Sequence, residues 1–207
     1  MNFLVKKSAS LRGEIDIPGD KSISHRAIML ASLSEGGCEI SGLLEGEDCL
    51  ATIEVFRKMG VKISSNEGVY YIEGNGIKGL KQPVAPLDFG NSGTSIRLCS
   101  GVLSAQNFPT TLIGDSSLSS RPMQRIVEPL TLMGAKISSS QDGTLPLSIL
   151  PTESLESIEY TLPVASAQVK SCIMFAGLFS KGKTKIVEKT ITRNHTETMF
   201  NAFGIPI

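Results

Sequence analysis

Small polar residues recur at three places along this 207-residue chain, in patterns that suit binding of a phosphate or carboxylate group. The segments read GDKS (19–22), GNSGT (90–94) and ASAQ (165–168). Each precedes an apolar pattern typical of a helix, so each would supply free backbone N–H groups and the positive end of a helix dipole. Three such helix ends brought together would form a strong oxyanion or phosphate site.

Cationic side chains accompany these segments. Lys21 and Arg26 lie in the first turns of one predicted helix, where they oppose the dipole, so an anionic ligand would explain them. Arg97 lies one turn into the next helix. Arg121 and Arg193 hold matching places just before two later helices. The alternative is that Ser22, Ser92 and Ser166 are ordinary helix N-caps, which is the simpler explanation for any one of them taken alone.

Composition narrows the class of ligand. The chain carries 20 Lys plus Arg and 20 Asp plus Glu, so its formal net charge is zero, and it has no Trp and three Tyr. An extended nucleic-acid-binding surface is therefore not expected. Cations concentrated at one set of helix ends in a neutral chain favour a small phosphorylated metabolite as the partner.

Metal and membrane sites are not indicated. The four cysteines are far apart with no C-x-x-C pair, and there are two histidines, so we expect buried thiols in a reducing compartment. The acidic run of Glu45, Glu47 and Asp48 fits an acidic first helical turn better than a metal or acid/base cluster. The longest apolar stretch, 172–179, is too short to cross a bilayer.

An internal repeat organises the chain. The segments FRKMGVKI (56–63), TLMGAKI (131–137) and FNAFGIPI (200–207) each read as a helix end, a glycine after the helix, and a strand. A first helix lies upstream of each, predicted over 22–34, 92–104 and 167–179. The second helices are predicted from residue 49, over 122–133 with a bend at Pro129, and over 196–203.

Strand-like runs complete the repeated unit. They precede the first helices at 13–19, 85–90 and 157–164 and follow them at 38–44, 109–115 and 183–189. Two more strands close the first two units, so the predicted unit is βαβαββ. The third copy stops at Ile207, where its last strand pair should begin, so we expect it to be truncated and to leave a sheet edge uncovered. A G-x-G-x-x-G string at 74–79 is not followed by a helical pattern and is discounted as a nucleotide fingerprint.

Five motifs at these repeat positions closely resemble the 5-enolpyruvylshikimate-3-phosphate synthase family. They are PGDKSISHR (18–26), FGNSGTSIR (89–97), SSRPM (119–123), VASAQVKS (164–171) and TRNHTE (192–197). The resemblance runs the full length of the chain and implies an α/β fold in which three βαβαββ units with pseudo-threefold symmetry form a lobe. It covers the N-terminal half only. Residues 1–19 would belong with the absent C-terminal lobe, and 20–207 would form the N-terminal lobe, incomplete at its C-terminus.

The resemblance also implies the reaction. Phosphoenolpyruvate would give its enolpyruvyl group to the 5-hydroxyl of shikimate 3-phosphate through a tetrahedral intermediate, with loss of phosphate, in the biosynthesis of aromatic amino acids. Lys21 would act in catalysis and reach both substrates. Shikimate 3-phosphate would be bound by Lys21, Ser22, Arg26, Ser166, Ala167, Gln168 and Arg193. Phosphoenolpyruvate would be bound by Lys21, Asn91, Gly93, Arg121 and Gln168.

Three positions affect which ligand contacts of the family are expected in this chain. Some family members have a second serine where Ala167 stands, which removes one hydroxyl donor. Some have Ser and Tyr near the position of Arg193. Gly93 is the residue type of glyphosate-sensitive members, so the intact enzyme is expected to bind glyphosate.

The resemblance sets further expectations for this chain. It implies no cofactor and no metal, a cytoplasmic location, and no nucleic-acid or membrane partner. The acidic general base would come from the C-terminal lobe, so the chain alone would be inactive and would bind shikimate 3-phosphate weakly. The alternatives are a UDP-N-acetylglucosamine enolpyruvyl transferase, which the PGDKSISHR segment disfavours, and a non-catalytic module that binds phosphate ligands.

Overall fold

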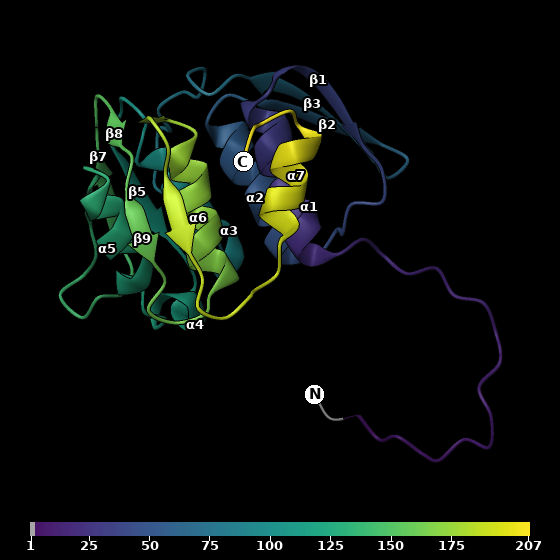
Figure 1. The fold of residues 1–207 in the computed structure, drawn as a ribbon. Helices are drawn as coiled ribbons and strands as arrows, with labels where there is room; N and C mark the ends of the chain where they lie inside the picture. Colours follow the sequence, from purple (N-terminus) through teal and green to yellow (C-terminus); the bar gives the residue numbers. More distant parts are fainter. Residues whose placement is uncertain (1–2) are drawn as a thin grey trace.

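The second repeat unit is complete in the computed structural model, which describes residues 3–207 (Figure 1). Its strands form a four-stranded sheet in the order β4-β5-β7-β6, with β4 parallel to β5 and the other neighbours antiparallel. The unit contains β4 (Leu87–Asp88), α3 (Gly93–Leu103), β5 (Thr110–Ile113), α5 (Gln124–Leu132), β6 (Lys136–Ser138) and β7 (Leu147–Leu150). This is the βαβαββ order predicted from the sequence.

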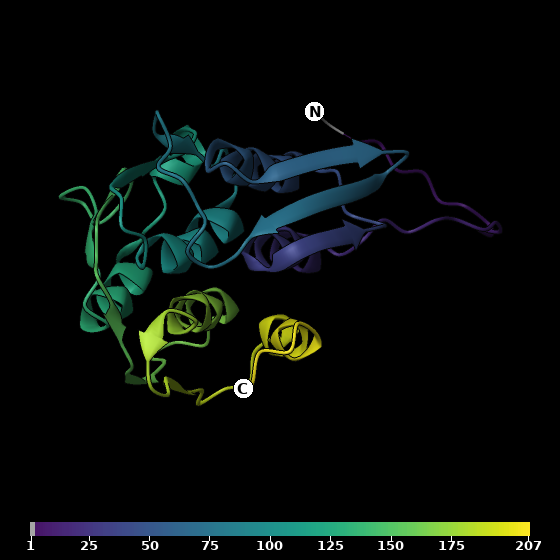
Figure 2. The same cartoon turned by 90° about the horizontal axis from the view of Figure 1, so that it is seen from above.

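The first unit has the same order without its first strand. Its sheet, β1-β3-β2, matches β5-β7-β6 in connectivity and pairing, and Figure 2 shows these strands side by side with helices beneath them. Alternation along the strands buries Ile63 and Ile72 and leaves Lys62 and Glu73 exposed. The elements are α1 (Lys21–Leu33), β1 (Glu35–Ile40), α2 (Glu47–Lys58), β2 (Lys62–Asn66) and β3 (Val69–Asn75).

The third unit repeats the first half of the pattern. Strand β9 (Glu159–Thr161) pairs in parallel with β11 (Lys185–Val187), as β4 does with β5. Helix α6 (Ala167–Gly177) connects them, and α7 (His195–Ala202) follows. A short parallel pair that the sequence did not indicate, β8 (Leu155–Glu156) with β10 (Ser180–Lys181), lies alongside.

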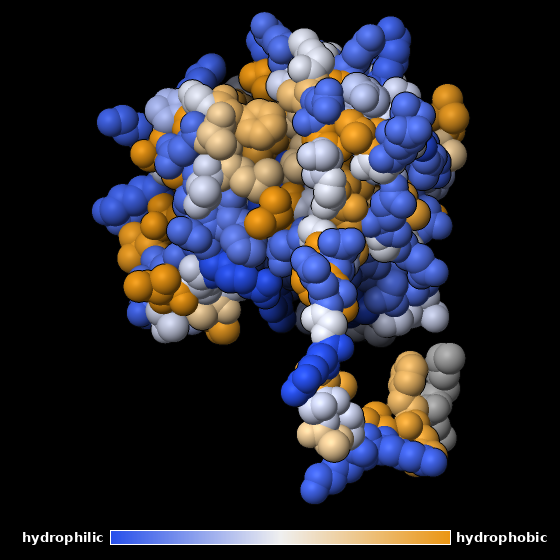
Figure 3. All heavy atoms as spheres, turned by 90° about the vertical axis from the view of Figure 1, so that its right-hand side faces the viewer, coloured by the Kyte–Doolittle hydropathy of each residue, from blue (hydrophilic) through white to orange (hydrophobic). Residues whose placement is uncertain are grey.

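The strand predicted over 13–19 does not form. Figures 1 and 3 show this segment extending away from the folded body, and its apolar side chains are open to solvent, with Ile15 78% and Ile17 76% exposed. A strand needs a neighbour for its backbone hydrogen bonds, and none lies beside this segment within residues 3–207. The chain rejoins the body at Gly19, where a Cβ atom would lie 2.1 Å from the Gly42 carbonyl oxygen.

The region around the SSRPM motif also differs from prediction. Pro122 precedes the helix rather than standing in its first turn, because α5 begins at Gln124 with Met123 as its cap. The preceding residues form a short helix, α4 (Ser116–Ser119), capped by the Asp115 side chain. Pro129 lies inside α5 as expected.

The core is continuous between the second and third units. Helices α3 and α6 approach so closely that a Cβ on Gly101 would lie 2.2 Å from the Cys172 carbonyl oxygen. The rings of Phe175 and Phe200 meet edge to face at 5.3 Å and join α7 to α6. The cysteines are free thiols, and burial raises the pKa of Cys99 to about 12. Among residues 3–207, no helix has the length and apolar character needed to cross a membrane.

Candidate ligand-binding site

The first helices of the three units begin beside one another. Thr52 on α2 donates to Ser95 on α3 at 2.8 Å and lies 2.8 Å from His25 on α1. Gln168, at the start of α6, donates to Thr94 at 3.1 Å, at the start of α3. These contacts lie in the first two turns of α1, α2, α3 and α6, so they place the N-termini of these helices at one end of the body. The small polar segments of the sequence are thereby brought together.

Two of the three serines that could be helix N-caps do cap a helix, and the third does not. Ser92 caps α3 by accepting from the Ser95 N–H at 3.2 Å, and Ser166 caps α6 by accepting from the Val169 N–H at 3.3 Å. In α1 the cap is Asp20, which accepts from the Ile23 N–H at 2.9 Å. Ser22 is therefore inside the helix, and its hydroxyl is left for other partners.

Two arginines flank Gly93 at the start of α3. Arg121 donates to the side chain of Asn91 and, at 3.4 Å, to its carbonyl. Arg97 donates to the Gly93 carbonyl and to the Pro122 carbonyl, each at 3.3 Å. A Cβ on Gly93 would lie 2.9 Å from one guanidinium nitrogen of Arg97 and 3.0 Å from one of Arg121. Glycine here lets two cations approach the helix start.

Gln168 connects this group to the third unit. Its carbonyl oxygen accepts from Arg97 at 3.0 Å while its amide donates to Thr94. Both hydrogen-bonding ends of the side chain are thus fixed. Ala167 is half-buried beside it and offers no polar side chain, so only its backbone N–H can serve a ligand. Asn91, Gly93, Arg121 and Gln168 form one contiguous set.

Arg26 connects the first and third units. It is 4% exposed and donates to Thr196 at 2.6 Å, to Ser171 at 2.7 Å and to the Ser22 carbonyl at 2.8 Å. Arg193, by contrast, is exposed, with one long contact of 3.4 Å to the Ser22 hydroxyl. Ser22, Arg26 and Arg193 therefore form a second set, joined to the first through α6.

Lys21 has a carboxylate partner, Asp48, that the sequence did not predict. Its ammonium forms an ion pair with Asp48 in the first turn of α2. Glu47 and Asp48 do form the acidic first turn of α2, as predicted, and Asp48 also pairs with Lys21. Glu45 does not belong to that turn, because it precedes the Gly46 cap and accepts a hydrogen bond from Tyr70 at 2.9 Å. Nothing in the spacing of 27 residues signals the pair of Lys21 with Asp48, because it depends on how α1 packs against α2.

The electrostatics of the arginines call for an anion. Among residues 3–207, none of Arg26, Arg97, Arg121 and Arg193 forms an ion pair with a carboxylate. Burial lowers the pKa of Arg26 to about 10. Burial also lowers the pKa of Arg97, and the nearby Arg125 and Arg121 add to the shift. The Arg97 Nε is buried without a partner. An anionic ligand would relieve these costs.

His25 lies behind the site as a neutral group. It is fully buried, and burial lowers its pKa to about 4, with Asp48 opposing the shift and Lys21 and Arg26 adding to it. Its Nδ1 is within hydrogen-bond distance of Thr52, and its Nε2 has no partner. The sequence placed this residue inside the PGDKSISHR motif without assigning it a role.

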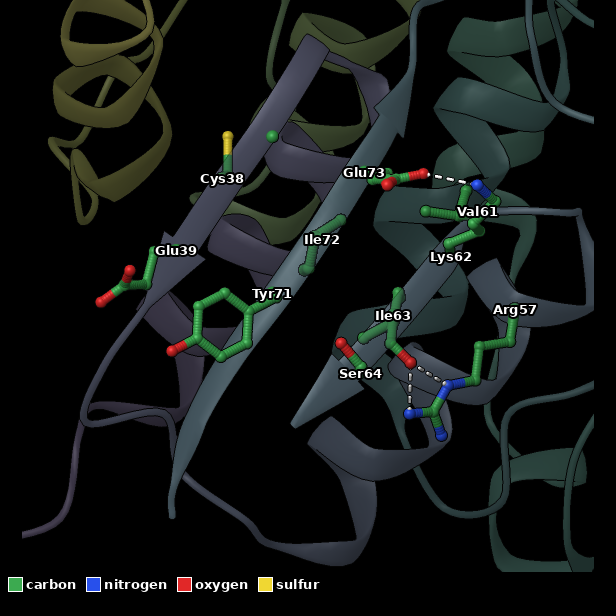
Figure 4. A pocket seen from close by; sticks show the side chains of 11 residues that line it. Cys38, Glu39, Arg57, Val61, Lys62, Ile63, Ser64, Tyr71, Ile72 and Glu73 are labelled. Carbon is green, nitrogen blue, oxygen red and sulfur yellow. Dashed lines mark hydrogen bonds and ion pairs between the residues drawn. The ribbon is translucent and has the colours of Figure 1, made fainter. Parts of the chain in front are cut away.

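Two hollows lie away from these residues. One is a shallow depression on the open face of the β1-β3-β2 sheet (Figure 4). Its cations have partners, since Lys62 pairs with Glu73 at 2.8 Å and Arg57 donates to the Ile63 carbonyl. The other lies between α6, β11 and α7. Within residues 3–207 no group of three or more His, Cys, Asp or Glu side chains could hold a metal ion.

The fold and these residues define the class: repeated α/β modules whose first helices begin around a cluster of arginines that have no ion pair with a carboxylate among residues 3–207. Comparison with known proteins identifies the family. The family model described as EPSP synthase (3-phosphoshikimate 1-carboxyvinyltransferase) matches residues 5–207, and the chain belongs to this family. The βαβαββ architecture inferred from the sequence is confirmed by the solved structure of EPSP synthase from Acinetobacter baumannii. That structure superposes with a TM-score of 0.90 at 52% identity, over 93% of this chain and 44% of that one.

Curated relatives agree. A 3-phosphoshikimate 1-carboxyvinyltransferase of Hydrogenovibrio crunogenus is 52% identical over 100% of this chain and 47% of its own length. The protein of the same name from Ruthia magnifica is 57% identical over 99% of this chain and 47% of its own length. The chain thus spans about half the length of the curated relatives that it matches.

Proposed function

We propose that this chain forms the shikimate 3-phosphate-binding part of a 3-phosphoshikimate 1-carboxyvinyltransferase. The reaction would transfer the enolpyruvyl group of phosphoenolpyruvate to the 5-hydroxyl of shikimate 3-phosphate and release phosphate. The observation that carries the proposal is the cluster of four arginines where α1, α3 and α6 begin, none of which forms an ion pair with a carboxylate in the described part of the chain. Both substrates are multiply charged anions, which such a cluster would bind.

Shikimate 3-phosphate would lie on the set joined to α1 and α6. The Ser166 and Gln168 side chains and the Ala167 N–H would hold its phosphate at the start of α6, where the helix dipole favours negative charge. Ser22, Arg26 and Arg193 would hold it from the other side. The fixed contacts of Arg26 to Ser171 and Thr196 mean that this cation is oriented before the ligand arrives.

Phosphoenolpyruvate would lie on the set joined to α3. Asn91, the Gly93 backbone and the Arg121 guanidinium would contact it, with Gln168 between the two substrates. Lys21 would leave its ion pair with Asp48 to face the reacting groups. Charge that develops on the tetrahedral intermediate would then be stabilised by oriented donors rather than by water. Holding both substrates in one site supplies the further rate gain of proximity.

Turnover would require groups outside this chain. The chain covers 47% of the length of its curated relatives, so groups from the remaining part would complete the site. We therefore expect the 207-residue chain to bind without catalysing, and the C-terminal lobe to complete the site. The physiological setting of this proposal is aromatic amino acid biosynthesis in the cytoplasm, which the free cysteines support.

Calorimetric titration of the purified chain with shikimate 3-phosphate tests the proposal. We expect weak binding that Arg26→Met abolishes and that Lys62→Met, which removes an exposed cation far from the site, leaves unchanged. The same titration with UDP-N-acetylglucosamine should give no heat. Binding of the nucleotide sugar but not of shikimate 3-phosphate would contradict the assignment, as would product formation by this chain without the C-terminal lobe.

A further inference from the structure

A buried cation outside the predicted site lies at the centre of an ion-pair cluster. Lys170, in the first turns of α6, is 4% exposed. Its Nζ lies 2.8 Å from Glu188 Oε2 and 2.6 Å from Glu197 Oε1. Lysine is almost never this buried unless it is paired, and here it has two carboxylates rather than one.

The two carboxylates belong to different parts of the chain. Glu188 follows β11, and Glu197 lies in the first turn of α7. Glu188 also accepts a hydrogen bond from Thr192. Lys170 thereby fastens both ends of the segment 188–194, which has no helix or strand of its own.

This segment and the first turn of α7 contact the first unit. Arg193 lies within it, and its own contact, 3.4 Å to Ser22, is too long and exposed to fix its position. Thr196, next to Glu197, receives the 2.6 Å hydrogen bond of Arg26 and lies 2.6 Å from Ser171. The location of Arg193, and one of the three hydrogen bonds that hold Arg26, therefore depend on where the segment and the start of α7 are held.

We propose that Lys170 is a positioning residue that acts through Glu188 and Glu197 to hold Arg193 and Thr196 at the side of the site that binds shikimate 3-phosphate. In this inference, the identity of the ligand as shikimate 3-phosphate rests on the proposed function. The fastening of the segment rests on the contacts alone.

Charge is essential to this role. Burial lowers the pKa of Lys170, but the hydrogen bonds to Glu188 and Glu197 outweigh burial and raise it overall, so the side chain is an ammonium. Without that charge two carboxylates would face each other in a partly buried space, where Glu197 Oε2 already lacks a partner. Their repulsion would drive the segment away from α6.

Hydrogen exchange and calorimetry on three variants of the 207-residue chain test the proposal. In Lys170→Met, we expect amides in 188–197 to exchange about tenfold faster and shikimate 3-phosphate to bind about tenfold more weakly, with exchange in β5 and β7 unchanged. Lys170→Arg, which keeps the charge, should retain most of the wild-type protection from exchange in 188–197 and most of the affinity for shikimate 3-phosphate. Lys185→Met, which breaks the exposed pair with Glu159 on the neighbouring strands, should change neither.

If Lys170→Met does not fold, Glu188→Gln replaces it, because that change removes one carboxylate and keeps the size of the side chain. Unchanged exchange in 188–197 would overturn the proposal, as would equal loss of affinity in the Arg and Met variants. A wild-type chain that does not bind shikimate 3-phosphate contradicts the proposed function instead, and the exchange data then decide separately whether Lys170 holds the segment.

Discussion

Arg97 donates a 3.0 Å hydrogen bond to the side-chain carbonyl of Gln168, joining helices α3 and α6 at the ends where they begin. The two residues are 71 positions apart and belong to equivalent helices of consecutive units. Because Gln168 also donates to Thr94, its orientation is fixed in the absence of ligand. This hydrogen bond thus connects equivalent helices of two repeat units at the candidate site. The residues around it can be tested by substitution.

Gly93→Ala should weaken phosphoenolpyruvate binding and glyphosate inhibition in the full-length protein by about tenfold or more. The added Cβ would lie 2.9 Å from Arg97 and 3.0 Å from Arg121, so both guanidinium groups must move from their present places. Inhibition assays across glyphosate concentrations measure the effect. Gly37→Ala, whose Cβ meets no atom within 4 Å, is the matched control. Unchanged glyphosate inhibition in Gly93→Ala would show the expectation to be wrong.

Arg121→Met should weaken phosphoenolpyruvate binding more than shikimate 3-phosphate binding in the full-length protein. A hydrogen bond to a charged group contributes about 1.5–3 kcal/mol, so the dissociation constant for phosphoenolpyruvate should rise at least about tenfold. Fluorescence or calorimetric titration with each substrate separates the two effects. An equal loss for both substrates would contradict the division of the site into two sets.

Stability should rise with pH between about 4 and 6.5 because of His25. Its pKa in the folded chain is about 4 against 6.5 unfolded, so in this window the unfolded state binds the extra proton and is favoured as pH falls. The shift corresponds to at most about 3 kcal/mol. Thermal melts from pH 4.5 to 7 should show this slope in the wild type and a smaller one in His25→Gln. Equal slopes would mean that other groups dominate.

Gly101→Ala should destabilise the fold, because its Cβ would lie 2.2 Å from the Cys172 carbonyl oxygen, which is backbone and cannot swing aside. Overpacking of this kind costs about 1–3 kcal/mol or more. The control is Gly177→Ala, a helical glycine whose Cβ would meet Thr184 at an ordinary 3.6 Å and which should be neutral or slightly stabilising. Urea denaturation of both variants gives the comparison, and a neutral Gly101→Ala would refute the close approach.

The helices were predictable because their apolar positions recur with helical spacing in every copy. The strand at 13–19 was predicted from the same repeat and is absent, because a strand also needs a partner that its own letters do not provide. Helix α4 was missed since four residues are too few to show a period. The local sequence pattern therefore predicts which segments can form helices or strands. Whether a predicted strand forms depends on a neighbouring strand with which it can pair.

The site was predictable only in part for a related reason. Small residues and cations at helix starts are visible as letters, and the structure gathers Asn91, Gly93, Arg121 and Gln168 into one contiguous set. The Asp48 partner of Lys21 cannot be predicted from the sequence, and neither can the Glu188 and Glu197 partners of Lys170. These pairs depend on the packing of one element against another, which no spacing along the chain encodes.

The backbone contact between Gly101 and Cys172 has a mechanical consequence. Helices that touch through their main chains cannot slide past each other without separating, so α3 and α6 must tilt as one body. Helix α1 is joined to α6 instead through the side chains of Arg26 and Ser171, which can rotate. Any adjustment of the site when a ligand binds therefore falls on the α1 side, while the wall built by α3 and α6 stays rigid.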